Sequence, residues 1–153
     1  MHSATIGILR SSFARIASHK VDVASIFYER LFEVAPSVRP LFKADLRDQQ
    51  QKLMIALVYV VQAVDDPQRL IGTLTTLGER HVAYGAKPEH YDVVGDTLLW
   101  TFEEILGDEF TPEVRDAWAA AYNLVANTMR AGAAAATTPV HVAPLMDSPQ
   151  PAA

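Results

Sequence analysis

Apolar residues recur along the chain at spacings of three and four, which is the period of an amphipathic α-helix. The clearest stripes are Ile6, Leu9, Phe13 and Ile16; Val23, Phe27, Leu31 and Val34; Leu70, Leu74, Leu77 and His81; Tyr91, Val94, Leu98, Phe102 and Ile105; and Val114, Trp118, Ala121, Val125 and Met129. No segment with a period of two is flanked by hairpin signals, so the pattern predicts an all-α fold.

Proline, glycine and aspartate mark the ends of the predicted helices. The second stripe ends at Pro36, which can open a short turn that reaches about Phe42. Asp66 followed by Pro67 is a typical helix start, a capping carboxylate before a first-turn proline. Further breaks occur at Gly85, Pro88, Gly107 and Pro112. These breaks divide the chain into about seven helices.

The segment from 45 to 64 is the hardest to interpret. Asp45 or Asp48 can cap a long helix that ends at Val64, and its second half, LMIALVYVVQAV, is apolar on nearly every side. Periodicity alone does not distinguish it from a buried strand, but the polar QQQK before it and its length favour a helix buried on most faces. Its longest apolar run is far shorter than the roughly 20 residues that span a bilayer, so we expect no membrane partner.

The composition changes near Ala131. Beyond it, proline and alanine are frequent and no apolar stripe continues, which is typical of a flexible tail. We therefore expect one folded domain over residues 1–132 and a tail over 133–153. His141 and Met146 fall in this tail, and we assign them no role.

Composition excludes several classes of protein. Half of the 153 residues are apolar, which suffices for one domain with a single core. The net charge is −5 without a basic block, which argues against nucleic acid as a partner. The chain has no Cys, so it forms no disulfide or Cys-ligated metal site. This is compatible with the cytoplasm, where we expect the protein. The first 21 residues lack acidic side chains, as in a transit peptide, but their apolar stripe favours a helix of the domain.

His81 is the residue that best indicates chemistry, because it continues the apolar stripe of Leu70, Leu74 and Leu77. A histidine on such a face is more often a hydrogen-bonded core residue than a ligand. No HExxH motif, histidine pair at i and i+4, Walker loop, GxGxxG or serine elbow is present. One buried imidazole nevertheless suits haem, which supplies four nitrogens itself. His90, after the Lys-Pro break, is interpreted as a solvated residue near a helix start.

Four stretches, in this order and spacing, resemble the globins: "FYERLFEVAPSVRPLF", "QQQKLM", "LGERHVAYG", and "HYDVVGDTLL" with "LGDEFTPEVRDAWAAAY". The resemblance spans about residues 3 to 130. It is greatest to bacterial single-domain haemoglobins of the flavohaemoglobin lineage, and the second half is also similar to the neuroglobins. It implies a globin fold, with helices that cross at about 50° around haem b (iron protoporphyrin IX), and it implies that His81 is the proximal ligand of the iron.

The resemblance implies roles for nine more residues. On the distal side, where a gas binds, they are Tyr28, Gln49 and Leu53; around the haem, they are Phe42, Lys52, Leu77, Arg80, Tyr91 and Val94. Without the resemblance, Tyr28 is an ordinary residue at the edge of the core and Gln49 a solvated one. Lys52 is either a partner of a haem propionate or a free surface charge, and Arg80 is a weaker candidate for the propionate.

A tyrosine hydroxyl and a glutamine amide can both donate hydrogen bonds to O₂ on ferrous haem, which carries partial negative charge. Tyr28 and Gln49 therefore predict high O₂ affinity and slow release, with less gain for CO. The helix from Asp45 to Val64 contains no histidine, unlike the distal helix of neuroglobins. We therefore expect a sixth iron position that is open or holds water.

Three functions fit these residues. The first is reversible O₂ binding for storage, delivery or oxygen transport. The second is nitric oxide dioxygenation, in which O₂ held at the haem oxidises NO to nitrate; we expect it to need a separate reductase, because the chain contains no flavin or nicotinamide domain. The late-helix glutamate that supports the proximal histidine of flavohaemoglobins falls near Ala133 here, which weakens this case. The third is a gas-sensing module.

Overall fold

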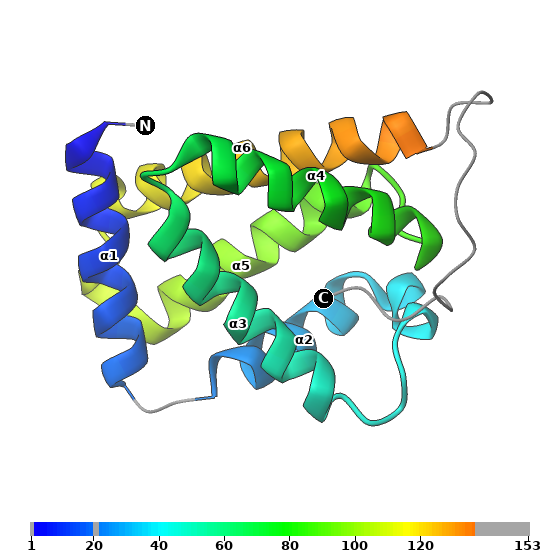
Figure 1. Cartoon of the computed structure of the whole chain (residues 1–153). Helices are drawn as coiled ribbons and strands as arrows, with labels where there is room; N and C mark the ends of the chain where they lie inside the picture. Colours follow the sequence, from blue (N-terminus) through cyan, green and yellow to red (C-terminus); the bar gives the residue numbers. More distant parts are fainter. Residues whose placement is uncertain (1, 20–21, 137–153) are drawn as a thin grey trace.

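Figure 1 shows the computed structural model, which describes residues 2–19 and 22–136. The described residues form helices and no strand, so the predicted all-α fold is confirmed. The α-helices are α1 (Ser3–Ser18), α2 (Val23–Val34), α3 (Arg47–Ala63), α4 (Pro67–Ala83), α5 (His90–Leu106) and α6 (Pro112–Ala136), and two short 3₁₀ helices are η1 (Pro36–Leu41) and η2 (Gly107–Glu109).

Capping residues set several of these ends as expected. Asp66 precedes α4, and its carboxylate accepts a hydrogen bond from the backbone N–H of Arg69, with Pro67 in the first turn. The other end of α4 closes on Gly85, whose φ of +92° lies in the region that glycine adopts without strain. The N–H of Ala86 donates back to the carbonyl of His81 at 3.0 Å. The chain thus reverses directly after the helix that carries His81.

The helices cross in layers rather than forming a parallel bundle (Figure 1). α4 lies along α6, α2 packs on α5, and α3 crosses over α2 and leads into α4. The core runs through the centre of this arrangement, where Leu9, Leu31 and Phe102 are almost fully buried. The one buried indole N–H of the core is satisfied, because Trp118 Nε1 donates to Ser12 Oγ at 2.9 Å.

The long apolar helix α3 differs from expectation in two ways. Neither Asp45 nor Asp48 is its N-cap: the cap position is Leu46, and Asp45 accepts a hydrogen bond from the backbone N–H of Arg47 at 3.0 Å. The expectation that α3 is buried on most faces is also wrong, since Ile55 is 61% exposed and Val58 39%. None of the described helices has the length and apolar character needed to cross a bilayer.

The last helix is longer than expected. α6 continues to Ala136, so residues 133–136 are helical, although we placed the start of the tail at 133. The rest of the expected tail, with His141 and Met146, lies outside the described residues.

Two glycines allow α4 and α6 to approach closely. A Cβ atom at Gly78 would clash with the backbone carbonyl of Met129, and one at Gly132 would clash with that of Thr75. Gly78 lies one turn before His81 on the buried face of α4. The position of His81 therefore depends on a contact between two backbones that only glycine permits.

We predict that Gly78→Ala destabilises the protein by about 1–3 kcal/mol, because the added methyl group overpacks the helix contact. Gly72→Ala is the matched control. It lies on the same helix with nothing within 4 Å of its would-be Cβ, so it should be neutral or stabilise by up to about 1 kcal/mol. Urea unfolding of the variants measures both changes, and equal stability of the two variants would contradict this account of the helix contact.

Candidate functional site

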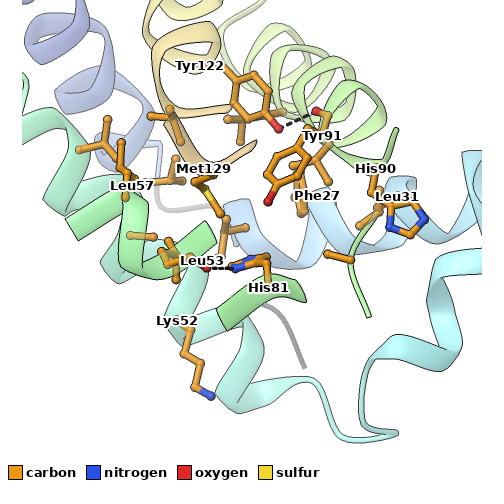
Figure 2. A pocket seen from close by; sticks show the side chains of 18 of the residues that line it. Phe27, Leu31, Lys52, Leu53, Leu57, His81, His90, Tyr91, Tyr122 and Met129 are labelled. Atoms are coloured by element: carbon orange, nitrogen blue, oxygen red, sulfur yellow. Dashed lines mark hydrogen bonds between the residues drawn. The ribbon is translucent and has the colours of Figure 1, made fainter. Parts of the chain in front are cut away.

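A cavity of about 470 Å³ opens between α3, α4 and α5, with α2 and α6 forming its inner walls (Figure 2). Its volume lies within the roughly 300–1,000 Å³ that is typical of small-molecule and cofactor sites. Its walls are almost entirely aliphatic and aromatic. The residues with polar groups that line it include His81, Tyr28 and Tyr91. Such a cavity suits a large, mostly apolar molecule held by few polar contacts.

The structure brings together eight of the ten residues expected at the site. Those that line the cavity are Tyr28, Phe42, Lys52, Leu53, Leu77, His81, Tyr91 and Val94. They come from α2, the segment after η1, α3, α4 and α5, so the site forms only when the whole domain folds.

His81 is held in one orientation by its own helix. Its Nδ1 lies 2.7 Å from the backbone carbonyl of Leu77, a contact drawn in Figure 2. A carbonyl oxygen only accepts hydrogen bonds, so Nδ1 carries the proton and the lone pair of the neutral ring lies on Nε2. The ring also contacts Tyr84 edge-on, with 5.6 Å between the ring centroids. The side chain is buried, so the sequence-based view of His81 as a residue of the apolar face is confirmed.

Tyr28 and Gln49 form a buried pair. The amide Nε2 of Gln49 donates to the Tyr28 hydroxyl oxygen at 3.0 Å, and both side chains are at least 95% buried. Burial raises the pKa of the Tyr28 phenol well above its ordinary value, although the bond from Gln49 lowers it slightly. Tyr28 therefore keeps its proton. Because its oxygen already accepts from Gln49, the hydroxyl can donate that proton toward the cavity.

Two expected residues do not line the cavity. Gln49 lies behind Tyr28, so the structure connects it to the cavity through the phenol rather than directly. Arg80 instead borders a separate surface depression beside Gly72 and Thr76. Lys52 is exposed at the outer edge of the cavity, and its side chain extends outward in Figure 2.

His90 lines the cavity mouth, although sequence reasoning placed it in solvent. The backbone N–H of Lys87 donates to its Nδ1 at 3.0 Å, so the proton of the neutral ring is on Nε2. The sequence did hold one indication that His90 lies at the cavity, because it directly precedes Tyr91, a residue expected at the site. The inner wall from α6 includes Trp118, Val125 and Met129, which the sequence placed on an apolar stripe. Such a stripe does not distinguish core from cavity wall.

Tyr91 and Tyr122 differ in how their hydroxyl groups are satisfied. Tyr122 donates to the backbone carbonyl of Tyr91 at 2.6 Å, as Figure 2 shows. The Tyr91 hydroxyl is buried and has no hydrogen-bond partner among the described residues, while its ring points into the cavity (Figure 2). Burial raises the pKa of both phenols. The Tyr91 hydroxyl is thus a polar group that the cavity wall leaves unpaired.

Comparison with known proteins identifies relatives across this region. The model of the family described as Globin matches residues 25–129. The protein named Flavohemoprotein from Chromobacterium violaceum is 34% identical over 128 residues, which is 82% of this chain and 32% of that protein. The Flavohemoprotein from Rhizobium meliloti is 31% identical with the same coverage. The chain therefore spans about a third of the length of these relatives.

Solved structures share the fold. One is a candidate nitric oxide dioxygenase from Rhodothermus marinus, engineered as a carbene transferase, with a TM-score of 0.77 and 27% identity over 88% of this chain and 94% of that one. A bacterial globin from Campylobacter jejuni has a TM-score of 0.76 at 22% identity, over 88% of this chain and 97% of that one.

We predict that Tyr91→Phe leaves stability unchanged or raises it by up to about 1 kcal/mol, because it removes a buried hydroxyl without a partner. Tyr122→Phe is the matched change. It breaks a hydrogen bond and should cost about 1 kcal/mol, and more if the Tyr91 carbonyl is left unsatisfied. Chemical unfolding of the haem-loaded variants, followed by circular dichroism, tests the pair. A loss in Tyr91→Phe as large as in Tyr122→Phe would show that the Tyr91 hydroxyl has a partner.

Proposed function

Because the chain belongs to the globin family, we propose that it is a haem protein that binds O₂ reversibly and releases it slowly. In this proposal His81 is the proximal ligand of the iron and Tyr28 the distal hydrogen-bond donor. The observation that carries it is one apolar cavity that holds both an imidazole with its lone pair on Nε2 and a phenol with a proton to donate.

The residues present fit a haem. No group of three or more His, Asp or Glu side chains that could bind a metal ion occurs in the part of the chain that the structure describes. Within the cavity, His81 is the buried imidazole, and His90 lies at the mouth. That donor set suits a macrocycle with four nitrogens. The chain has no Cys for covalent attachment through thioethers, which supports haem b. Lys52 and His90, which line the mouth of the cavity, would pair with the haem carboxylates.

A haem would supply the iron at which diatomic gases bind, and the surrounding side chains would set the rate at which they dissociate. His81 presents a neutral imidazole because its Nδ1 proton is bonded to a carbonyl and not to a carboxylate. Position 133, where a supporting glutamate is expected in flavohaemoglobins, is alanine. A neutral proximal ligand favours reversible binding over the activation of oxygen that a peroxidase needs.

On the distal side, Tyr28 donates to a polar diatomic ligand in the cavity, while Gln49 holds the phenol oxygen from behind. A hydrogen bond to a charge-bearing acceptor contributes about 1.5–3 kcal/mol. If this appears mainly in dissociation, release slows about ten- to a hundredfold. Leu53, Phe42 and Val94 limit the access of water to the same space.

We predict that Tyr28→Phe speeds O₂ dissociation about ten- to a hundredfold, with a much smaller effect on CO. Gln49→Leu should speed O₂ dissociation less, because it removes the hydrogen bond that orients the Tyr28 hydroxyl but leaves the hydroxyl in place. Tyr59→Phe is the control, since Tyr59 also lines the cavity but its hydroxyl donates to Thr73 at 2.8 Å in an exposed position. Stopped-flow displacement of O₂ by CO measures all three. An unchanged rate in Tyr28→Phe would remove Tyr28 from the mechanism.

A second function, conversion of NO and O₂ to nitrate, has specific support from the similarity to flavohemoproteins and to a candidate nitric oxide dioxygenase. This reaction requires one electron from outside in each cycle. The chain spans about a third of the length of its flavohemoprotein relatives. We propose that a reductase supplies the electron.

Repeated NO consumption distinguishes the two functions. If the protein is primarily an O₂ carrier, the O₂-loaded form consumes one equivalent of NO and then stops, even with a generic flavin reductase and NADH. Sustained turnover that depends on the reductase would favour the dioxygenase. An NO electrode measures both outcomes, with the reductase alone as the control.

A further inference from the structure

The Arg39 side chain binds the backbone of the segment between α2 and α3 at several points. Three successive backbone carbonyls after η1 accept hydrogen bonds from the Arg39 guanidinium: those of Phe42 and Lys43 from Nη1, at 3.3 and 3.0 Å, and that of Ala44 from Nη2, at 3.3 Å. Carbonyls outside regular helices need partners. A planar guanidinium with five donors can serve several of them at once, and an ammonium group lacks this fork.

The same guanidinium contacts an aromatic cluster that consists of Phe32, Phe42 and Tyr28. Arg39 lies over the ring of Phe32, 4.9 Å from its centroid. Phe32 packs edge-on against Phe42, with centroids 5.4 Å apart. Both rings then contact Tyr28, at 5.9 and 5.6 Å. Arg39 is therefore the outermost member of a cluster whose innermost member is the distal phenol.

Tyr28 depends on this segment at two points. Its ring packs against Phe42, which Arg39 holds through the backbone, and its hydroxyl accepts from Gln49, which lies just after the segment in the first turn of α3. A shift of the segment would move the ring contact and the hydrogen bond together. A hydroxyl that misses its target by a fraction of an ångström donates a much weaker bond.

We infer that Arg39 is a positioning residue for the Tyr28 hydroxyl and sets the rate of ligand release without touching the ligand. This inference rests on the proposed function, because it assigns Arg39 a role in the same distal site. Arg47 offers a matched comparison: it is also an arginine beside this segment, but its guanidinium pairs with Asp45 at the surface, at 2.7 Å, and not with the cluster.

The experiment uses haem-loaded protein and four variants: Arg39→Ala, Arg39→Lys, Arg47→Ala and Tyr28→Phe. Arg39→Ala should speed O₂ dissociation about three- to tenfold, a coupling of the size seen within one network. The O₂ dissociation rate of Arg39→Lys should lie between those of Arg39→Ala and the wild type. If Arg39→Ala fails to take up haem, the comparison of Arg39→Lys with the wild type tests the inference. Arg47→Ala should leave the rate unchanged.

The double variant Arg39→Ala/Tyr28→Phe tests whether Arg39 acts through the phenol. The inference requires that Arg39→Ala adds almost nothing when Tyr28 is already Phe. An equal acceleration in both backgrounds would overturn it. If Tyr28→Phe speeds release and neither Arg39 variant does, the inference fails and the proposed function stands. If Tyr28→Phe itself has no effect, the proposed function fails.

The infrared stretching band of bound CO separates positioning from general stability, since it reports the electric field at the ligand. Arg39→Ala should add a second band at the frequency seen in Tyr28→Phe, from molecules in which the phenol has moved away. A lower melting temperature with an unchanged CO band would mean that Arg39 only stabilises the fold, and would overturn the inference.

Discussion

The hydrogen bond from His81 Nδ1 to the Leu77 carbonyl is the interaction on which the site depends. It joins two residues of one helix, so it fixes the ring orientation and the tautomer as soon as α4 forms. The helix itself is held by its glycine contact with α6 and by the reversal at Gly85. A lone pair on Nε2 is therefore presented to the cavity by backbone geometry rather than by a second side chain.

The distal side is built differently, from long-range contacts. Tyr28 and Gln49 are 21 residues apart, and their bond forms only when α2 and α3 pack with the intervening segment in place. Burying two polar side chains costs free energy unless they are paired, and each here satisfies the other. In the proposed function, the phenol's remaining proton is the group that distinguishes a polar ligand such as O₂ from a less polar one such as CO. The orientation of the iron ligand is therefore fixed locally on α4 in this proposal, whereas the residence time of the gas depends on the packing of three elements.

Much of the fold could be predicted because it depends on local signals. Apolar period, the Asp66–Pro67 start and the glycine breaks all act within a few residues. The resemblance to globins then predicted that His81 and seven other residues, which lie far apart in the sequence, share one site, and all eight line the cavity. Other features depend on tertiary geometry. Gln49 lies behind Tyr28 because of how α3 starts, and nothing in the letters QQQK distinguishes a direct donor from a supporting one. The exposed face of α3 at Ile55 could not be predicted, because the helix sequence is apolar on nearly every side.

The most direct test of the account is the visible spectrum of the protein with hemin, compared between the wild type and His81→Gly. We expect the wild type to bind one hemin with a sharp Soret band. His81→Gly should lose the pigment or change its ligation, and added imidazole, which fits the space left by the side chain, should restore the wild-type spectrum. A wild-type protein that stays colourless, or a His81→Gly spectrum identical to that of the wild type without imidazole, would contradict the assignment of His81 as the iron ligand.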